Sequence, residues 1–134
     1  MTLSPEDARV IDEVYTSLSE PDLDRFVACF TADGELHDLP DMPGERVYRG
    51  HEGLRQWAES RLELADAWEW RLEEILADEG GTVVSRAHVE IQGHGSGLTV
   101  EMDVFHVAVL RDGHIAKVMG FSRRDEAFEA AGLS

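Results

Sequence analysis

The sequence predicts an α+β domain in which helices pack on one face of a strongly curved, mainly antiparallel sheet and enclose an apolar pocket. Apolar residues recur at helical spacing within the first 34 residues and again over residues 50–65, and the period changes to two from residue 67 onward. One face of the predicted strands also carries small apolar side chains. Small side chains on a covered concave face leave volume unfilled, so we expect a pocket there.

Three helices are predicted before the long strands. Ser4 followed by Pro5 is typical of a helix start, and Pro21 ends this helix and opens a second one. The third helix begins near Gly50. The first helix buries Val10, Ile11, Val14, Tyr15 and Leu18. The second buries Leu23, Phe26, Val27 and Phe30, before Asp33 and Gly34 turn the chain. The third presents Leu54, Trp57, Ala58, Leu62 and Ala65 on one side.

Alternation predicts a short strand at residues 35–38 and four longer strands at 68–76, 82–92, 98–110 and 114–121. Short glycine-containing turns join the long strands, so we expect them to be antiparallel. A short helix at 126–131 ends at Gly132. In the strand at 82–92, the side chains expected to face the helices are Val83, Ser85, Ala87, Val89 and Ile91. In the last strand they are Ala116, Val118 and Gly120.

Composition limits the class of partner. The chain has 134 residues and fits one domain, residues 1–134. Its 12 basic and 28 acidic residues give a formal net charge of −16, which repels nucleic acid and anionic membrane surfaces. No apolar run approaches the ~20 residues that span a bilayer, and no leader is evident, so we expect a cytoplasmic protein. No dense metal-ligand spacing and no phosphate-binding loop is present, so we expect neither metal nor cofactor.

Several segments in this order resemble the nuclear transport factor 2-like superfamily, and within it the SnoaL-like group. They are Tyr15-Thr16-Ser17-Leu18, Phe30-Thr31-Ala32-Asp33-Gly34, Tyr48-Arg49-Gly50, Phe105-His106-Val107 and Leu110-Arg111-Asp112-Gly113. The group includes polyketide cyclases and has relatives among ketosteroid isomerases and limonene epoxide hydrolases. The resemblance implies a conical barrel and a homodimer formed through the outer sheet face. Arg86, His88 and Glu90 would then be interface or solvated residues.

The resemblance also suggests where the chemistry lies. In ketosteroid isomerases a carboxylate at the end of the first short strand removes a proton next to a carbonyl, and Asp38 matches that position. The alternative, an exposed aspartate that caps the following turn, stays open. The tyrosine position of those enzymes falls on Val14, with Tyr15 one residue later. The position of their second acid falls on Phe105, with Asp103 two residues earlier. We therefore expect an acid and base pair of Asp38 and Asp103, with His37 and Tyr15 as hydrogen-bond partners.

The expected activity is a cofactor-independent isomerase, cyclase or lyase that acts on a small hydrophobic carbonyl compound by carboxylate acid and base chemistry. The resemblance implies an aspartate at the end of the last strand in many SnoaL-like cyclases and epoxide hydrolases, where this chain has Phe121-Ser122-Arg123-Arg124. An epoxide hydrolase fits less well, because the strands do not supply its Asp, Arg, Asp relay in the right register. The alternative is a ligand-binding or dimerisation module without catalysis. The residues expected to bind the substrate are Val14, Trp57, Trp68, Ala87, Val89, Phe105, Val118, Phe121 and Ser122.

Overall fold

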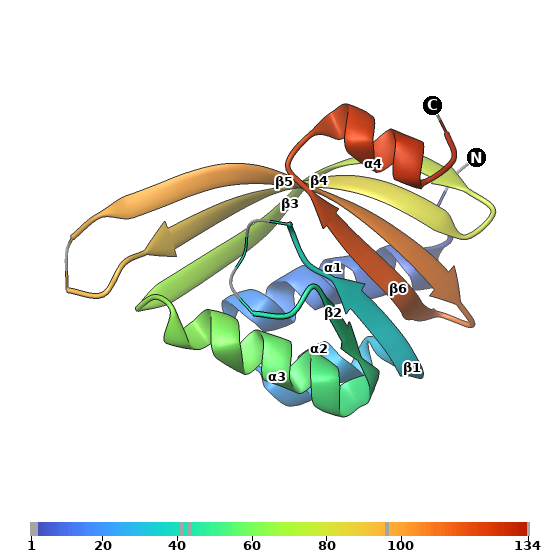
Figure 1. Ribbon diagram of the computed structural model, residues 1–134. Helices are drawn as coiled ribbons and strands as arrows, with labels where there is room; N and C mark the ends of the chain where they lie inside the picture. The colour runs from blue at the N-terminus through green and yellow to red at the C-terminus, as the bar shows by residue number, and fades with distance from the viewer. Residues whose placement is uncertain (1–2, 41, 43, 96, 134) are drawn as a thin grey trace.

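The structure is a computed structural model that describes residues 3–40, 42, 44–95 and 97–133. Its elements follow the order α1 (Pro5–Ser19), α2 (Leu23–Ala28), β1 (Phe30–His37), β2 (Val47–Arg49), α3 (Gly50–Glu63), β3 (Ala67–Glu79), β4 (Thr82–Gln92), β5 (Thr99–Arg111), β6 (His114–Phe121) and α4 (Arg124–Ala130). The sheet is strongly bent. Helices α1, α2 and α3 lie on its concave side, and α4 lies across the opposite side (Figure 1). The predicted α+β class with a curved, helix-covered sheet is confirmed.

All six strands form one sheet in the order β2-β1-β6-β5-β4-β3. The pairs are antiparallel except β1 with β6, which run parallel. Within the described ranges the two edge strands, β2 and β3, do not pair with each other, so the sheet is curled but not closed into a barrel. The long predicted strands correspond to β3, β4, β5 and β6, and their antiparallel pairing is confirmed.

The helix starts follow from local chemistry. The Ser4 side chain accepts a hydrogen bond from the backbone N–H of Asp7 at 3.1 Å, and Pro5 occupies the first turn of α1. Asp22 caps α2 in the same way by accepting from the N–H of Arg25. These caps satisfy backbone donors that a helix leaves without partners.

The second helix is shorter than the apolar stripe predicts. It ends at Ala28, and Phe30 is the first residue of β1 rather than the last of the helix. Cys29 accepts a hydrogen bond from the N–H of Ile115 in β6, and Phe30 pairs with that same residue. Strand pairing therefore overrides continuation of the helix. Asp33 and Gly34, expected to form a turn, lie within β1 where its register with β6 shifts. Strand β2 was not predicted from the sequence.

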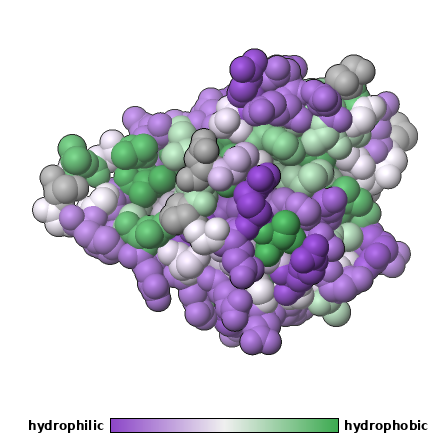
Figure 2. All heavy atoms as spheres, viewed as in Figure 1, coloured by the Kyte–Doolittle hydropathy of each residue, from purple (hydrophilic) through white to green (hydrophobic). Residues whose placement is uncertain are grey.

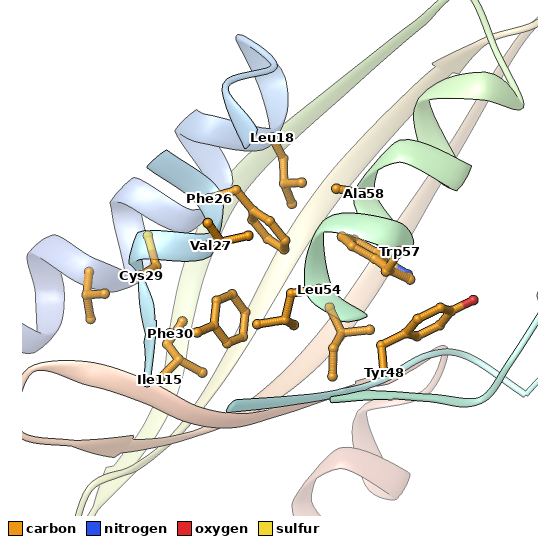
Figure 3. Close-up of a cluster of buried hydrophobic side chains, with 12 residues drawn as sticks. Leu18, Phe26, Val27, Cys29, Phe30, Tyr48, Leu54, Trp57, Ala58 and Ile115 are labelled. Carbon is orange, nitrogen blue, oxygen red and sulfur yellow. The ribbon is translucent and has the colours of Figure 1, made fainter. Parts of the chain in front are cut away.

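A hydrophobic core fills the space between the three helices and β1. Phe26, Phe30, Leu54 and Trp57 converge there from α2, β1 and α3 (Figure 3). The Phe26 ring packs on Phe30 edge to face and on Trp57 in a stacked arrangement, with centroids 5.3 and 5.6 Å apart. This core fixes α3 against β1, and these two elements position Asp38, Trp57 and Arg61, described below.

The visible surface is mainly hydrophilic, as the acidic composition predicts (Figure 2). Hydrophobic residues gather at the end of the molecule where the β4–β5 hairpin projects. Leu98 and Val100, two large exposed apolar residues, belong to this hairpin. Among the residues that the structure describes, no helix is both long and apolar enough to cross a bilayer.

A two-residue turn at Gly80 and Gly81 joins β3 to β4. Both residues have positive φ, +58° and +86°, which is the backbone of a tight hairpin turn. A Cβ on Gly80 would meet no atom within 4 Å, so a side chain there costs only backbone strain.

We therefore expect Gly80→Ala to lower the free energy of unfolding by about 1 kcal/mol, because alanine is strained in the left-handed region. Gly80→Asn is the matched control and should cost less, since asparagine tolerates that region. Urea denaturation measures both variants. Equal effects of alanine and asparagine would contradict this account of the turn.

Candidate active site

A cavity of about 120 Å³ lies between the concave face of the sheet and helices α1 and α3. A space of this order accommodates a small organic molecule. Most of its wall is apolar, contributed by residues such as Leu18, Phe26, Val89 and Val118. Besides three tryptophans, its lining includes six residues with polar or charged side chains: Tyr15, His37, Asp38, Arg61, Ser85 and His106. The predicted pocket is therefore present.

Asp38 lies at the end of β1, is only 8% exposed, and is held by donors from α3. Its Oδ2 accepts from Trp57 Nε1 at 3.0 Å and from the Arg61 guanidinium. Its Oδ1 accepts from the backbone N–H of Leu39 at 2.8 Å. Asp38 accepts from the next N–H, as a turn-capping aspartate would, but its side chain is buried and not exposed.

Arg61 is the ion-pair partner of Asp38 and is itself only 4% exposed. It lies one helical turn after Trp57, and its guanidinium carbon is 5.9 Å from the Trp57 ring centroid. Arg61 is not among the site residues predicted from the sequence. A signal was available, since Arg61 falls within the predicted buried stripe of Leu54, Trp57 and Ala58, where a charged residue needs a partner.

A second polar group faces the cavity from α1 and the sheet. The Tyr15 hydroxyl is 2.6 Å from His106 Nδ1 and 3.0 Å from Ser85 Oγ. Ser85 and His106 are direct cross-strand partners in β4 and β5, so the sheet register places them side by side. The Tyr15 and His106 rings are tilted against each other, with centroids 5.5 Å apart. We call Tyr15, Ser85 and His106 the polar triad.

Burial decides the protonation of this triad. Desolvation lowers the pKa of His106 to about 4, although the negative charge of Asp38 acts in the opposite direction. Burial also raises the pKa of Tyr15 above its usual range, while its hydrogen bond with Ser85 lowers it. At neutral pH the imidazole is therefore uncharged and the phenol keeps its proton.

His106 was not selected from the sequence as a site residue. Strand β5 is covered on both faces near its centre, because α4 packs on the outer side against Phe105 and Val107. Apolar residues on both faces remove the alternation that would show which face is inside. Ser85 lies on the face of β4 that is turned toward the cavity, and it pairs directly with His106. His106 can therefore be assigned to the same face only when the register of the β4–β5 hairpin is known.

The structure brings most of the predicted site residues to the cavity. Those that line it are Val14, Tyr15, His37, Asp38, Trp57, Trp68, Val89 and Val118. The His37 ring is turned toward Glu35, with Nε2 3.0 Å from Oε1. Ala87 lies on the same face of β4 but packs against Ile11 and Tyr15. The Tyr15 hydroxyl contacts Ser85 and His106, and among the hydrogen bonds of the described residues it makes none with Asp38.

Four predicted residues lie away from the cavity. Phe105 and Phe121 pack in the cluster under α4, on the other side of the sheet. Ser122 lies beside Phe105 in a surface depression at the start of α4. Asp103 faces outward, 3.0 Å from His88 Nδ1 and 3.5 Å from the Arg86 guanidinium. The expected pair of Asp38 and Asp103 does not form, because odd-numbered residues of β5 lie on the face of the sheet opposite to helices α1, α2 and α3.

The outer face also holds a group with metal-ligand character. In the described part of the chain, one set of residues brings three such donors together: His88, Glu90 and Glu101, with ligand atoms within 4.8 Å of one another. Both His88 nitrogens are already hydrogen-bonded, to Asp103 and Glu101, and the carboxylates raise the pKa of His88. This set lies across the sheet from the cavity.

Tryptophans form one wall of the cavity. The Trp68 and Trp70 rings are stacked at 5.9 Å with planes 11° apart, and Trp70 lies 6.3 Å from the His106 ring. Trp68 Nε1 is buried and has no hydrogen-bond partner among the described residues. These flat faces suit a ring-shaped apolar ligand.

The buried ion pair leads to a prediction about stability. Asp38→Asn or Arg61→Gln alone should lower the free energy of unfolding by about 3–5 kcal/mol, because each leaves a buried charge without its counter-charge. The double variant should lose less than the sum of the two. Urea denaturation of the four proteins measures this coupling. Strictly additive losses would show that the two charges do not stabilise each other.

The sequence matches the SnoaL-like domain family over residues 11–118. No curated protein matches the sequence. Among solved structures, TerC co-crystallized with polyporic acid has a TM-score of 0.80 and 17% identity, covering 95% of this chain and 98% of that one.

Two further structures are similar. A putative SnoaL-like polyketide cyclase from Jannaschia sp. CCS1 has a TM-score of 0.75 and 16% identity, covering 100% and 98% of the two chains. SalBIII, described as an epoxide hydrolase/cyclase-like enzyme of pyran ring formation in salinomycin, has a TM-score of 0.73 and 18% identity, covering 90% and 92%. The family match spans most of the sequence, and the chain belongs to the SnoaL-like domain family.

Proposed function

We propose that the protein is a cofactor-independent enzyme that moves a proton next to the carbonyl group of a small apolar compound, with Asp38 as the base. The observation that carries this proposal is a carboxylate, buried and fixed by three donors, on the wall of a mostly apolar cavity. Positioned carboxylates in water-poor sites are effective bases, since the reacting geometry is set before the substrate arrives.

The hydrogen bonds of Asp38 leave its Oδ1 atom with an unused acceptor position, where it can take up a proton. Oδ2 already accepts from Trp57 and Arg61, whereas Oδ1 accepts only from the Leu39 N–H among the described residues. A carboxylate oxygen can accept two hydrogen bonds, so Oδ1 keeps a position for a proton. In the proposed step the C–H bond next to the carbonyl breaks, its proton moves to Oδ1, and its electron pair forms an enolate. Return of the proton to another carbon completes an isomerisation.

The comparisons support small-molecule chemistry of this kind at the level of the family. TerC was crystallised with polyporic acid, and the Jannaschia protein is described as a putative polyketide cyclase. We infer that the substrate of this chain is a hydrophobic carbonyl compound. The reaction would be an isomerisation, a cyclisation or a lyase reaction. An ion pair that fully occupies Asp38 would instead favour the second candidate, a ligand-binding module without catalysis.

Deuterium exchange tests the proton transfer without knowledge of the natural product. Cyclohexanone and larger cyclic ketones are incubated in D₂O with the protein, and loss of the proton signal next to the carbonyl is followed by NMR. We expect the protein to accelerate exchange and Asp38→Asn to lower the rate by about 10²–10⁴-fold. The double variant Asp38→Asn/Arg61→Gln gives the same test without a lone buried charge.

Asp33→Asn is the matched control, since Asp33 is an exposed carboxylate on β1, the strand that Asp38 directly follows. It should exchange ketone protons at the unmodified rate, and circular dichroism shows whether each variant is folded. An Asp38→Asn protein that is folded and equally fast would remove Asp38 from the mechanism. Ketones that bind without any accelerated exchange would favour the module without catalysis.

We also propose that the protein forms a homodimer through the outer face of the sheet. Arg86, His88 and Asp103 make this face polar near the middle of β4 and β5. Such a dimer would carry charged pairs across its interface, and its association would weaken as salt increases.

A further inference from the structure

The proposed proton transfer places negative charge on the substrate's carbonyl oxygen, and that oxygen needs a hydrogen-bond donor. Trp57 Nε1 and the Leu39 N–H are directed at Asp38. The Tyr15 hydroxyl has one proton, and its two contacts are Ser85 and His106. Two other groups on the wall can donate to a ligand: the buried Trp68 Nε1–H, which has no partner among the described residues, and the His106 imidazole. Of these two, His106 is held by the polar triad, and its tautomer decides whether it can donate.

The protons of the triad can be counted. Neutral imidazole carries one N–H, and each hydroxyl carries one O–H. In one arrangement Ser85 donates to Tyr15, Tyr15 donates to His106 Nδ1, and the imidazole proton lies on Nε2. In the reverse arrangement Nδ1 donates to Tyr15 and Tyr15 donates to Ser85, so the Ser85 proton has no acceptor among the described residues.

The two arrangements differ in cost. Ser85 is 3% exposed, and a buried hydroxyl proton without an acceptor costs ~1–3 kcal/mol. The reverse arrangement pays that cost and also leaves the Nε2 lone pair without a donor. The first arrangement leaves one group without a partner, the Nε2–H of a ring that lines the cavity. The triad therefore favours the tautomer with its proton on Nε2.

We propose that His106, through Nε2–H, binds the carbonyl or enolate oxygen of the ligand, with Tyr15 and Ser85 as positioning residues that fix its tautomer. The enolate part rests on the proposed function, whereas oxygen binding does not. The class of ligand follows: a ring-shaped apolar molecule with one oxygen acceptor, which stacks on the tryptophan wall and is hydrogen-bonded at the polar triad.

The charges around His106 are consistent with a neutral donor. Tyr15 faces it from α1 and Ser85 from β4, and both are uncharged at neutral pH. Asp38, from the end of β1, is the charged group whose field reaches the ring, and Arg61 on α3 neutralises it. A neutral imidazole that is already fixed in place can donate to an enolate oxygen without further movement, whereas a mobile charged side chain would first have to be ordered.

Nitrogen NMR of uniformly labelled protein tests the tautomer directly. At pH 7 we expect His106 to show protonated Nε2 and unprotonated Nδ1. At pH 5.5 it should remain neutral, because its pKa is lowered to about 4. His88 is the internal control and should be protonated at pH 5.5, since Asp103 and Glu101 raise its pKa. A proton on Nδ1 of His106, or a cationic ring at pH 5.5, would overturn the proposal.

Binding of 4-nitrophenol tests the donor, because its phenolate absorbs visible light and presents an anionic oxygen on a flat ring. We expect His106→Leu to bind at least about tenfold more weakly than the unmodified protein, since a hydrogen bond to a charged acceptor is lost. His106→Gln keeps an N–H and should restore most of the affinity. Equal binding by a folded His106→Leu protein would refute the donor role.

The two proposals fail separately. Each proposal is measured on its own variant: ketone exchange compares the unmodified protein with Asp38→Asn/Arg61→Gln, and 4-nitrophenol binding compares the unmodified protein with His106→Leu. If ketone exchange is absent while His106 still controls phenol binding, the base is wrong and the oxygen site stands. If ketone exchange depends on Asp38 but His106→Leu binds 4-nitrophenol as tightly as the unmodified protein, the oxygen site is wrong and the base stands.

Discussion

The buried ion pair of Asp38 and Arg61 is the interaction on which the organisation of the site depends. It joins the end of β1 to the last turns of α3, and Trp57 reinforces it from the preceding turn of the helix. A carboxylate inside an apolar cavity without such a partner would take up a proton or be excluded from the core. The pair therefore allows a charged group to face a cavity whose other walls are mostly apolar.

The curvature of the sheet gives that charged group a space to face. Small residues on the concave side of β4 and β6, such as Ser85 and Gly120, leave room that Trp57, Trp68 and Trp70 line without filling. The polar triad and the ion pair both open into this space, from different elements. An apolar middle with a polar group on each side orients a small molecule that has one oxygen and one acidic C–H bond.

The fold could be predicted from the sequence because its signals are local. Ser4 and Pro5 at a helix start, paired glycines at turns, and the change of period near residue 67 each depend on a few adjacent residues. The end of α2 was predicted less well, since the pairing of Phe30 with a strand 85 residues later competes with helix formation.

The site was predicted only in part because its remaining residues depend on distant contacts. Asp38 could be found at the end of a predicted strand. His106 and Asp103 could not be told apart by face, since α4 makes both sides of β5 apolar near Phe105. Arg61 was recognisable only as a charged residue in a buried stripe. Tyr15 was expected to serve Asp38, but the register of β4 and β5 places its partners, Ser85 and His106, on another wall.

A crystal structure of the protein with bound cyclohexanone would test the central claim most directly. This account predicts the ring inside the cavity, its oxygen within hydrogen-bond distance of His106 Nε2, and a carbon next to the carbonyl facing Asp38 Oδ1. Cyclohexanone in the cavity with its oxygen on Arg61 and only ring carbons against His106 would contradict the assigned roles. Cyclohexanone bound only outside the cavity would contradict the site itself.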